Sequence, residues 1–246
     1  MPLSANTVFH FTEKKEDLEG ILEHDFKVYY CKEQLYIGRN PMVFRAPMVS
    51  FCDIPLSEIK PHIKSYGPYG IGLSKEWAVR SKLNPVIYME KNSFLSASLI
   101  KFLSHYTELI DQRDEASTEA KRAPFDIFRY MKNYQGDLVR RDRDTIKDYR
   151  FSDEREWRYV PEFTKAFPMM LIQPYHDHHL VNAEKAIQSE SLVFTPNDIK
   201  YLIIKDDSEI NEFVKFLKYA KWKYDEKDVE RLTTRILTSK QIHEDI

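Results

Sequence analysis

Apolar and polar residues alternate along several short stretches of this chain, and that period-two pattern predicts β-strands that bury one face. The clearest example is Thr7-Val-Phe-His-Phe-Thr12. Prolines end or interrupt several of these stretches, which is typical of strand ends and edges. Gly38-Arg-Asn-Pro41 predicts a turn. The stretches predicted to be extended are residues 7–12, 26–36, 47–55, 71–73, 85–89, 169–173, 192–194 and 201–204.

Apolar residues recur at helical spacing in other parts of the chain, which predicts amphipathic helices. The predicted helices are residues 14–24, 56–63, 75–81, 93–110, 125–134, 209–219 and 226–240. We interpret residues 93–149 as a helical insertion between two strands and residues 207–240 as a helical C-terminus. The fold class is therefore predicted to be α+β, a single domain over residues 1–246 with a core of two small, mainly antiparallel packed sheets.

Composition narrows the function classes. Apolar residues make up 42% and charged residues 31% of the chain, with a formal net charge of −2, so no global charge favours nucleic acid or membrane. The six glycines form no phosphate-binding or dinucleotide-binding loop. No signal peptide or membrane-spanning run is found, so we expect a cytoplasmic protein that contacts no membrane. Cys31 and Cys52 are too few for a disulfide framework, and Cys52 is expected to be buried.

The densest concentration of charge and aromatic residues is Phe151-Ser-Asp-Glu-Arg-Glu-Trp-Arg-Tyr-Val-Pro161. If the block ends in a strand, Glu154, Glu156 and Arg158 share one face, and Trp157 with Tyr159 occupies the other. The aromatic face is expected to turn inward, which leaves two carboxylates facing a cleft or solvent. The pair is then either a solvated row of ion pairs or a site that requires carboxylates.

Two further positions carry candidate chemistry. His10 and Thr12 point the same way at the end of the first predicted strand, where the next helix begins and an anionic group is favoured. The competing interpretation is a histidine bonded to a backbone carbonyl beside a threonine that caps the helix. Tyr66 and Tyr69 lie in a segment with three of the six glycines, where backbones approach closely and an aromatic ring has a flat surface to stack on. The competing interpretation is a tight turn with two core tyrosines.

Two charged clusters were also considered as binding sites. The basic run before the central block is diluted by aspartates, which favours a solvated loop over a nucleic-acid surface. The histidines of Tyr175-His-Asp-His-His179 have no partner at metal-ligand spacing, so no metal site is expected.

Four stretches together resemble one family. They are Phe9-His-Phe-Thr12, Pro47-Met-Val-Ser-Phe-Cys-Asp-Ile-Pro-Leu56, Tyr66-Gly-Pro-Tyr-Gly-Ile-Gly-Leu-Ser-Lys-Glu-Trp77 and Asp153-Glu-Arg-Glu-Trp-Arg158. The sequence resembles the AbiGi family of bacterial abortive-infection proteins from Val8 to about Lys215. That resemblance implies a role in a phage-defence toxin–antitoxin pair, with a cognate toxin or antitoxin protein as the partner.

A more distant similarity is to ADP-ribosyltransferases, including DNA-modifying toxins of phage defence, in the order of a His-x-Thr strand, central aromatics and a late Glu-x-Glu strand. It implies an ADP-ribosyltransferase-like core and NAD as co-substrate. The middle motif of that superfamily is not matched residue for residue, and the insertion has no counterpart in the minimal fold. The roles implied are a catalytic Glu156 assisted by Glu154, a ribose-binding His10 beside Thr12, and a nicotinamide-supporting aromatic that is Tyr66 or Tyr69.

Together the two resemblances imply a mono-ADP-ribosyltransferase that acts as a toxin of an anti-phage system. Its acceptor is expected to be single-stranded RNA or DNA rather than protein, because basic residues are interleaved with aromatics near the predicted catalytic strand. The residues expected to bind that acceptor are Arg140, Arg141, Arg143 and Arg155. The alternatives are a non-enzymatic antitoxin or interaction module with a structural Glu-x-Glu row, and a metal-dependent nuclease at His176, His178 and His179.

Overall fold

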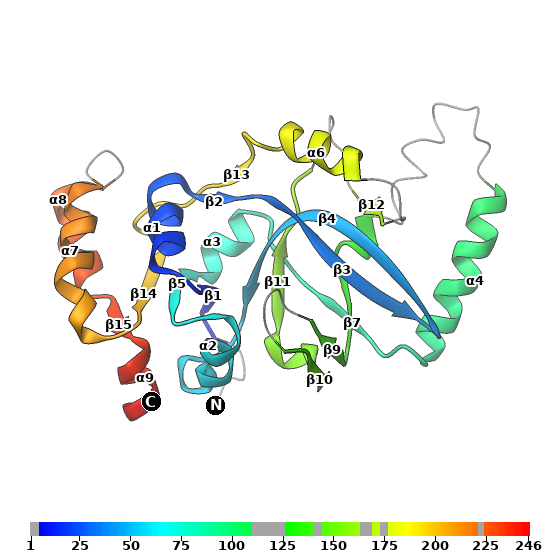
Figure 1. Ribbon diagram of the computed structural model, residues 1–246, viewed down its shortest axis with the longest axis horizontal. Helices are drawn as coiled ribbons and strands as arrows, with labels where there is room; N and C mark the ends of the chain where they lie inside the picture. The colour runs from blue at the N-terminus through cyan, green and yellow to red at the C-terminus, as the bar shows by residue number, and fades with distance from the viewer. Residues whose placement is uncertain (1–4, 110–125, 140–143, 163–168, 173–176, 221–223) are drawn as a thin grey trace. The chain divides into compact units, whose positions relative to one another are not determined.

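The computed structural model describes residues 5–109, 126–139, 144–162, 169–172, 177–220 and 224–246, and Figure 1 shows its elements in chain order. The chain divides into two compact units. The first unit contains residues 1–27, 49–83 and 190–246, and the second contains residues 28–48 and 84–189. Both units combine helices with short strands, so the mixed α+β class is confirmed. The prediction of a single domain stays a prediction.

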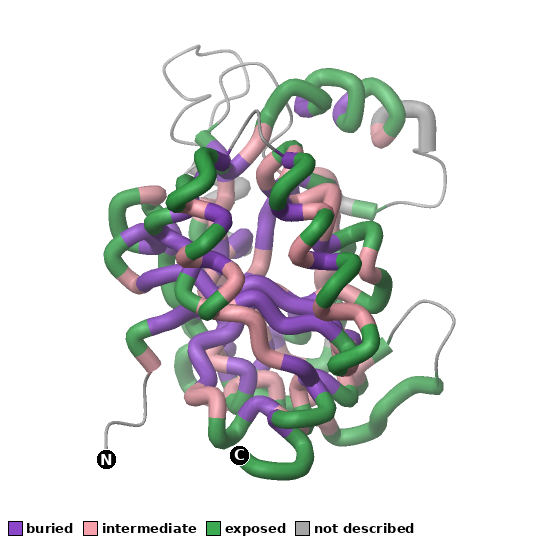
Figure 2. The backbone as a smooth tube through the Cα atoms, turned by 90° about the vertical axis from the view of Figure 1, so that its left-hand side faces the viewer, coloured by how far each residue is buried: buried purple, intermediate pink, exposed green. Residues whose placement is uncertain are grey.

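The first unit is built on strand β1 (Thr7–Thr12), which carries His10. Strand β5 (Tyr69–Ser74) pairs with β1 antiparallel along its whole length, from Thr7 opposite Ser74 to Thr12 opposite Tyr69. On the other side of β1, Phe9 lies opposite Cys52, the last residue of strand β4 (Asn40–Cys52). Strand β1 is thus held between two neighbours, and β5 is buried at every residue. Figure 2 draws the buried positions of the chain in purple.

Two more strands extend this sheet. Strand β14 (Ile199–Ile204) pairs antiparallel with β5, and strand β15 (Ile236–Thr238) pairs parallel with β14. A separate two-stranded pairing joins β2 (Phe26–Lys27) to β13 (Ser191–Leu192). The helices of the first unit are α1 (Lys15–His24), η1 (Leu56–Glu58), α2 (Lys60–Tyr66), α3 (Lys75–Arg80), η3 (Asp207–Glu209), α7 (Ile210–Tyr219), α8 (Glu226–Thr233) and α9 (Ser239–Asp245).

The glycine-rich segment of the first unit is a site of close backbone approach, as its composition predicted. Gly67 has a φ of 118°, and a Cβ atom there would lie 2.2 Å from the carbonyl oxygen of Thr12. In β5, a Cβ atom on Gly72 would lie 2.7 Å from the ring of Phe9. Side chains larger than hydrogen are therefore excluded where the segment crosses β1.

The second unit is organised around a long hairpin. Strand β3 (Tyr29–Ile37) pairs with the first part of β4, from Tyr29 opposite Met48 to Ile37 opposite Asn40, and β12 (Met170–Leu171) pairs with the other edge of β4. Strand β11 (Glu156–Tyr159) lies between β4 and β6 (Asn84–Pro85) in the same sheet. Two further pairs are β7 (Ile87–Met89) with β8 (Met131–Asn133) and β9 (Gly136–Leu138) with β10 (Ile146–Tyr149). The second unit also contains the helices α4 (Phe94–Leu109), η2 (Phe151–Glu154) and α6 (Asp177–Ala186).

Each unit buries its own apolar cluster. Phe9, Phe11, Cys52 and Ile203 belong to the cluster of the first unit, which confirms the predicted burial of Cys52. Leu35, Phe44, Met89, Phe128 and Met131 belong to the cluster of the second unit, and Leu99 and Leu103 of α4 pack against it.

Several local predictions are wrong. Residues 131–133 form strand β8, not helix, so the predicted helical insertion contains strands β8, β9 and β10 after α4. Residues 226–240 form two helices separated by β15, because Ile236 and Leu237 pair with β14. Thr12 does not cap helix α1; its Oγ1 donates to the carbonyl of Lys14. In the described part of the chain, no helix is both long enough and apolar enough to cross a bilayer.

Candidate active site

The predicted catalytic glutamates lie at the junction between helix η2 and strand β11. Glu154 is the last residue of η2, and Glu156 is the first residue of β11. Arg155 between them has a φ of 44°, in the left-handed region that a side chain with a Cβ rarely adopts. The prediction that Glu154 continues the strand is therefore wrong. The sharp turn at Arg155 instead directs both carboxylates to one place.

The two faces of β11 are reversed relative to the prediction. Glu156 and Arg158 are buried, with 5% and 0% of their surfaces exposed, whereas Trp157 and Tyr159 are only half-buried. Glu154 is buried as well. The rule that the aromatic face turns inward fails because the ionic side chains find partners of opposite charge inside the second unit.

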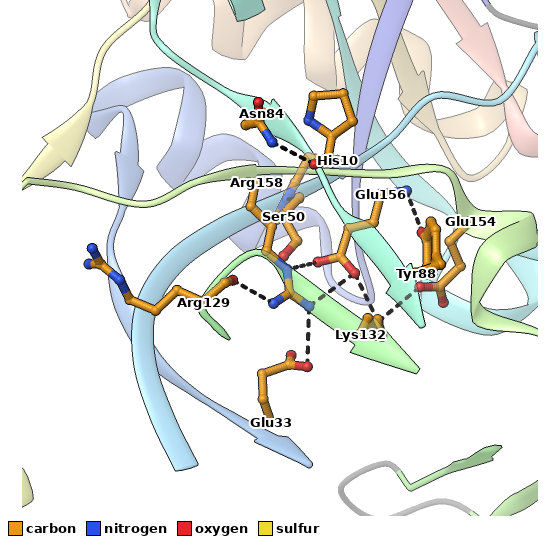
Figure 3. A network of polar contacts seen from close by, with 11 residues as sticks. His10, Glu33, Ser50, Asn84, Tyr88, Arg129, Lys132, Glu154, Glu156 and Arg158 are labelled. Carbon is orange, nitrogen blue, oxygen red and sulfur yellow. Dashed lines mark hydrogen bonds and ion pairs between the residues drawn. The ribbon is translucent and has the colours of Figure 1, made fainter. Parts of the chain in front are cut away.

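Arg158 is the centre of this buried cluster. Its Nε donates to Glu156 Oε1 at 2.7 Å and its Nη2 donates to Glu156 Oε2 at 3.2 Å. The same Nη2 lies 3.1 Å from Glu33 Oε2, and Nη1 donates to the carbonyl of Arg129 at 2.8 Å. Figure 3 shows the guanidinium between the two carboxylates. The position of Glu156 is thus fixed by a two-point contact from its own strand.

Lys132 joins the two glutamates of the Glu-x-Glu motif. Its Nζ donates to Glu156 Oε2 at 2.9 Å and to Glu154 Oε2 at 3.0 Å, as drawn in Figure 3. Near the junction, the backbone N–H of Glu156 donates to the hydroxyl of Tyr88 at 2.8 Å. The sequence did not indicate Lys132 or Glu33, because both lie on other strands and their contacts with β11 are tertiary features. We name Glu33, Lys132, Glu154, Glu156 and Arg158 the ionic cluster.

The electrostatics of the ionic cluster follow from burial opposed by ion pairing. Burial acts to lower the pKa of Lys132, but Glu156, Glu154 and Glu33 raise it well above its ordinary value. Burial also acts to lower the pKa of Arg158, and Glu156 and Glu33 raise it. Both cations are therefore fully charged at neutral pH. Lys132 offsets the repulsion between Glu154 and Glu156.

His10 is bonded to a backbone carbonyl, which is the alternative to ligand binding that the sequence left open. Its Nδ1 lies 2.8 Å from the carbonyl oxygen of Ser50; both residues are labelled in Figure 3. The centre of its ring lies 5.2 Å from that of Phe26, in an edge-on contact, and 5.6 Å from that of Phe51. Because a carbonyl only accepts, Nδ1 carries the proton and Nε2 of the neutral ring is an acceptor. Burial lowers the pKa of His10, which favours this neutral form; the bond to Ser50 and the charge of Asp17 act in the opposite direction.

The other predicted NAD-binding residues also lie in the first unit. Thr12 is half-buried and lies on the same face of β1 as His10, as the alternation predicted. Tyr66 is half-buried at the end of α2, with its ring 4.4 Å from that of His62. Tyr69 is buried, and its hydroxyl donates to Glu209 at 2.8 Å. Of the two tyrosines, Tyr66 is therefore the one with an exposed surface.

The structure thus groups the predicted site residues in two sets. Glu154 and Glu156 meet in the ionic cluster of the second unit, whereas the histidine, threonine and tyrosines belong to the first unit. Of the predicted acceptor-binding residues, Arg155 lies between the two glutamates, while Arg140, Arg141 and Arg143 lie outside the described residues.

The histidine-rich segment supplies no evidence for a metal site. His176 lies outside the described residues, and of His178 and His179 the structure describes only the backbone in α6. Within the described ranges, no group of three or more potential ligands is placed to hold a metal ion.

Comparisons with known proteins give a single consistent result. The family model described as "Putative abortive phage resistance protein AbiGi, antitoxin" matches residues 24–205. The "Abortive phage resistance protein AbiGi" of Lactococcus lactis subsp. cremoris is 28% identical over 214 residues, which cover 79% of this chain and 84% of that protein. No solved structure matches.

Proposed function

Because this chain belongs to the AbiGi family, it is an abortive phage resistance protein, and we propose that it acts in phage defence as an NAD-dependent mono-ADP-ribosyltransferase. The ionic cluster is the observation that supports this proposal. A buried ion pair adds little to stability compared with apolar residues of similar size, because desolvation offsets the attraction between the charges. A group of five charged side chains at a strained turn is therefore better explained by chemistry than by packing.

The cluster suits a reaction in which positive charge develops on a sugar. In ADP-ribosyl transfer, the bond between nicotinamide and the ribose C1 breaks, and the electron pair leaves with nicotinamide. A fixed carboxylate such as Glu156 stabilises the positive charge left on the ribose, as carboxylates do in glycoside cleavage. The nucleophile of the acceptor then bonds to C1 and loses its proton to Glu154, which is the base in this proposal.

The tautomer of His10 defines its part in this proposal. Because Nδ1–H is engaged by the Ser50 carbonyl, the neutral ring offers a ribose hydroxyl an acceptor at Nε2 and no donor. Binding of NAD should therefore weaken at low pH, where the ring takes a second proton.

For the acceptor we propose single-stranded nucleic acid. Near the Glu-x-Glu junction, the rings of Tyr149 and Phe151 lie 5.3 Å apart at a steep angle, and 41% of Tyr134 is exposed. Exposed aromatic rings are surfaces on which bases stack. Lys147 is paired with Asp137, so the positive charge of this region is partly neutralised. The identity of the acceptor is therefore tested separately from the transfer reaction.

The experiment is incubation of the purified protein with labelled NAD and total bacterial extract, followed by digestion of the product with nuclease or protease. Glu156→Gln should lower NAD cleavage by about two to three orders of magnitude while the protein remains folded, because glutamine preserves shape without charge. Glu162→Gln, at an exposed glutamate of the same unit, is the matched control and should be fully active. Full activity of Glu156→Gln would exclude this role. A label lost only to protease would replace nucleic acid by protein as the acceptor.

A second candidate is favoured by the printed description of the family model, which names the family an antitoxin. In that case the chain is a non-enzymatic protein that binds a toxin, and the ionic cluster is structural. Expression of the chain by itself separates the two candidates. An antitoxin leaves growth unaffected and adds no label from NAD, whereas a transferase toxin arrests growth, and Glu156→Gln relieves the arrest.

A further inference from the structure

Lys132 contacts both glutamates of the Glu-x-Glu motif. We propose that Lys132 is a positioning residue that holds Glu154 and Glu156 together as a doubly ionised pair. Its meaning for catalysis rests on the proposed transferase function, and its effect on the two carboxyl groups can be tested without that function.

The geometry shows that Lys132 joins two separate elements. Glu154 belongs to helix η2 and Glu156 to strand β11, and the left-handed turn at Arg155 separates them. The Nζ atom lies 3.0 Å from the Glu154 carboxylate and 2.9 Å from the Glu156 carboxylate, so it holds the two carboxylates close to each other. Without a cation at that point, two buried carboxylates at the two ends of one turn repel each other.

Lys132 is itself held in place. Only 14% of its side chain is exposed, and Nζ lies 4.7 Å from the centre of the Phe151 ring. The next residue, Asn133, accepts a hydrogen bond from the backbone N–H of Tyr36 at 2.7 Å and donates to its carbonyl at 2.9 Å. Strand β8 is thus fixed to β3, and Lys132 projects from a rigid strand.

The other charged and titratable groups around Lys132 do not replace it. They are Glu33 on β3, Tyr88 on β7 and Arg158 on β11. Arg158 contacts Glu156 and Glu33. Burial raises the pKa of Tyr88, so its hydroxyl is neutral and supplies no charge. The cluster therefore has three carboxylates and two cations, and loss of Lys132 leaves the Glu154–Glu156 pair without its shared cation.

The test measures the two carboxyl groups directly. The side-chain carboxyl carbons of glutamate are labelled with ¹³C, and the pKa values of Glu154 and Glu156 are followed by NMR in the wild-type protein, Lys132→Met and Lys132→Arg. Removal of a cation within hydrogen-bond distance should raise the higher of the two pKa values by at least about one unit. Lys132→Arg keeps a positive charge at this position, so both carboxyl pKa values should stay close to those of the wild-type protein. Lys147→Met, in an exposed pair with Asp137, is the matched control and should leave both values unchanged.

The second measurement is the pH profile of NAD cleavage. In Lys132→Met the acidic limb should move upward by the same amount as the carboxyl pKa, with a lower kcat and an unchanged KM for NAD. If Lys132→Met does not fold, the comparison is made with Lys132→Gln, whose amide keeps a hydrogen-bond donor at that point but carries no charge.

The outcomes are distinct. Unchanged carboxyl pKa values in Lys132→Met overturn the inference, whatever the activity of the wild-type protein. A shifted pKa with an unmoved pH profile also overturns it, because the pair is then not positioned for the reaction. If the carboxyl pKa shifts in Lys132→Met but the wild-type protein does not cleave NAD, the proposed function is refuted and the role of Lys132 is confined to the structure of the cluster.

Discussion

Replacement of Arg158 by methionine should be among the most destabilising single changes in the second unit. Arg158 has none of its surface exposed, and its guanidinium makes two contacts with Glu156, one with Glu33 and one with the carbonyl of Arg129. Methionine fills much of the volume but removes the charge. Breaking a buried ion pair from one side costs about 3–5 kcal/mol, because the partner charge stays buried without compensation. Two carboxylates depend on this cation, so we expect the upper part of that range.

The assay is urea unfolding at neutral pH, compared with Arg150→Met. Arg150 lies 4.0 Å from Asp153, and both side chains are more than half exposed, so its loss should cost about 0.5 kcal/mol or less. The slope of unfolding free energy against urea should be the same in both variants if the native fold is unchanged. The double variant Glu156→Gln/Arg158→Met should recover part of the loss, since the charge left behind is also removed.

The pH dependence of this loss gives a further check. Without Arg158, the carboxyl group that loses its cation, Glu156 or Glu33, should have a higher pKa in the folded protein than the value of about 4.3 in the unfolded chain. The destabilisation is then full well above the folded pKa and shrinks as the pH falls and the carboxyl is protonated. If Arg158→Met costs no more than Arg150→Met, or if its cost is independent of pH, then the buried pairing is not what fixes this part of the molecule.

Two predictions concern the first unit. Gly67→Ala places a Cβ atom 2.2 Å from the carbonyl oxygen of Thr12 at a φ of 118°, and it should cost at least about 3 kcal/mol, seen as a fall of roughly 6 °C or more in Tm. Gly20→Ala, in α1 with nothing within 4 Å of the new Cβ, should instead stabilise by about 0.5–1 kcal/mol; equal effects of the two changes would contradict this explanation. Because burial lowers the pKa of His10 below 6.5, the unfolded chain takes up a proton first as the pH falls. The free energy of unfolding should therefore decrease below pH 6.5, by up to about 1.4 kcal/mol per pH unit, and His10→Gln should flatten this part of the curve in urea titrations.

The strands that the sequence predicted well are those whose burial follows simple alternation or an uninterrupted apolar run. In β1, alternation placed His10 and Thr12 on one face, as the structure has them. Strand β14 contains a run of apolar residues and is buried at its last three positions. Local pattern was sufficient in these strands because each buries its apolar residues against neighbours of ordinary composition.

Strands β8 and β15 could not be predicted in the same way. Strand β8 has only three residues, and two of them are the polar Lys132 and Asn133. Its extended form depends on pairing with β7 and on the hydrogen bonds between Asn133 and Tyr36, which join positions far apart in the chain. In β15, pairing with β14 overrides a helical pattern that runs through the same residues. Tertiary partners decided both cases, and no local propensity reports them.

The Glu-x-Glu motif shows how far sequence reasoning reached at the candidate site. The motif could be found, and its two residues do meet. Their burial could not be foreseen, because it depends on Lys132 from β8 and Arg158 with Glu33 from β11 and β3. The charge row was therefore expected in a cleft or in solvent, and it is found inside the second unit.

Because the charge row is buried, a structural role and a catalytic role of Glu156 can be separated by measuring both stability and activity. If the ionic cluster is only structural, variants that leave its net charge unchanged, such as the double variant Glu156→Gln/Arg158→Met, should retain whatever the chain does in phage defence in proportion to their stability. If Glu156 is catalytic, the same double variant loses NAD cleavage even where its stability recovers, because no remaining group supplies a negative charge at that position. A stable double variant that still cleaves NAD would contradict the catalytic role of Glu156, and a stable one that loses both cleavage and defence would contradict the purely structural role.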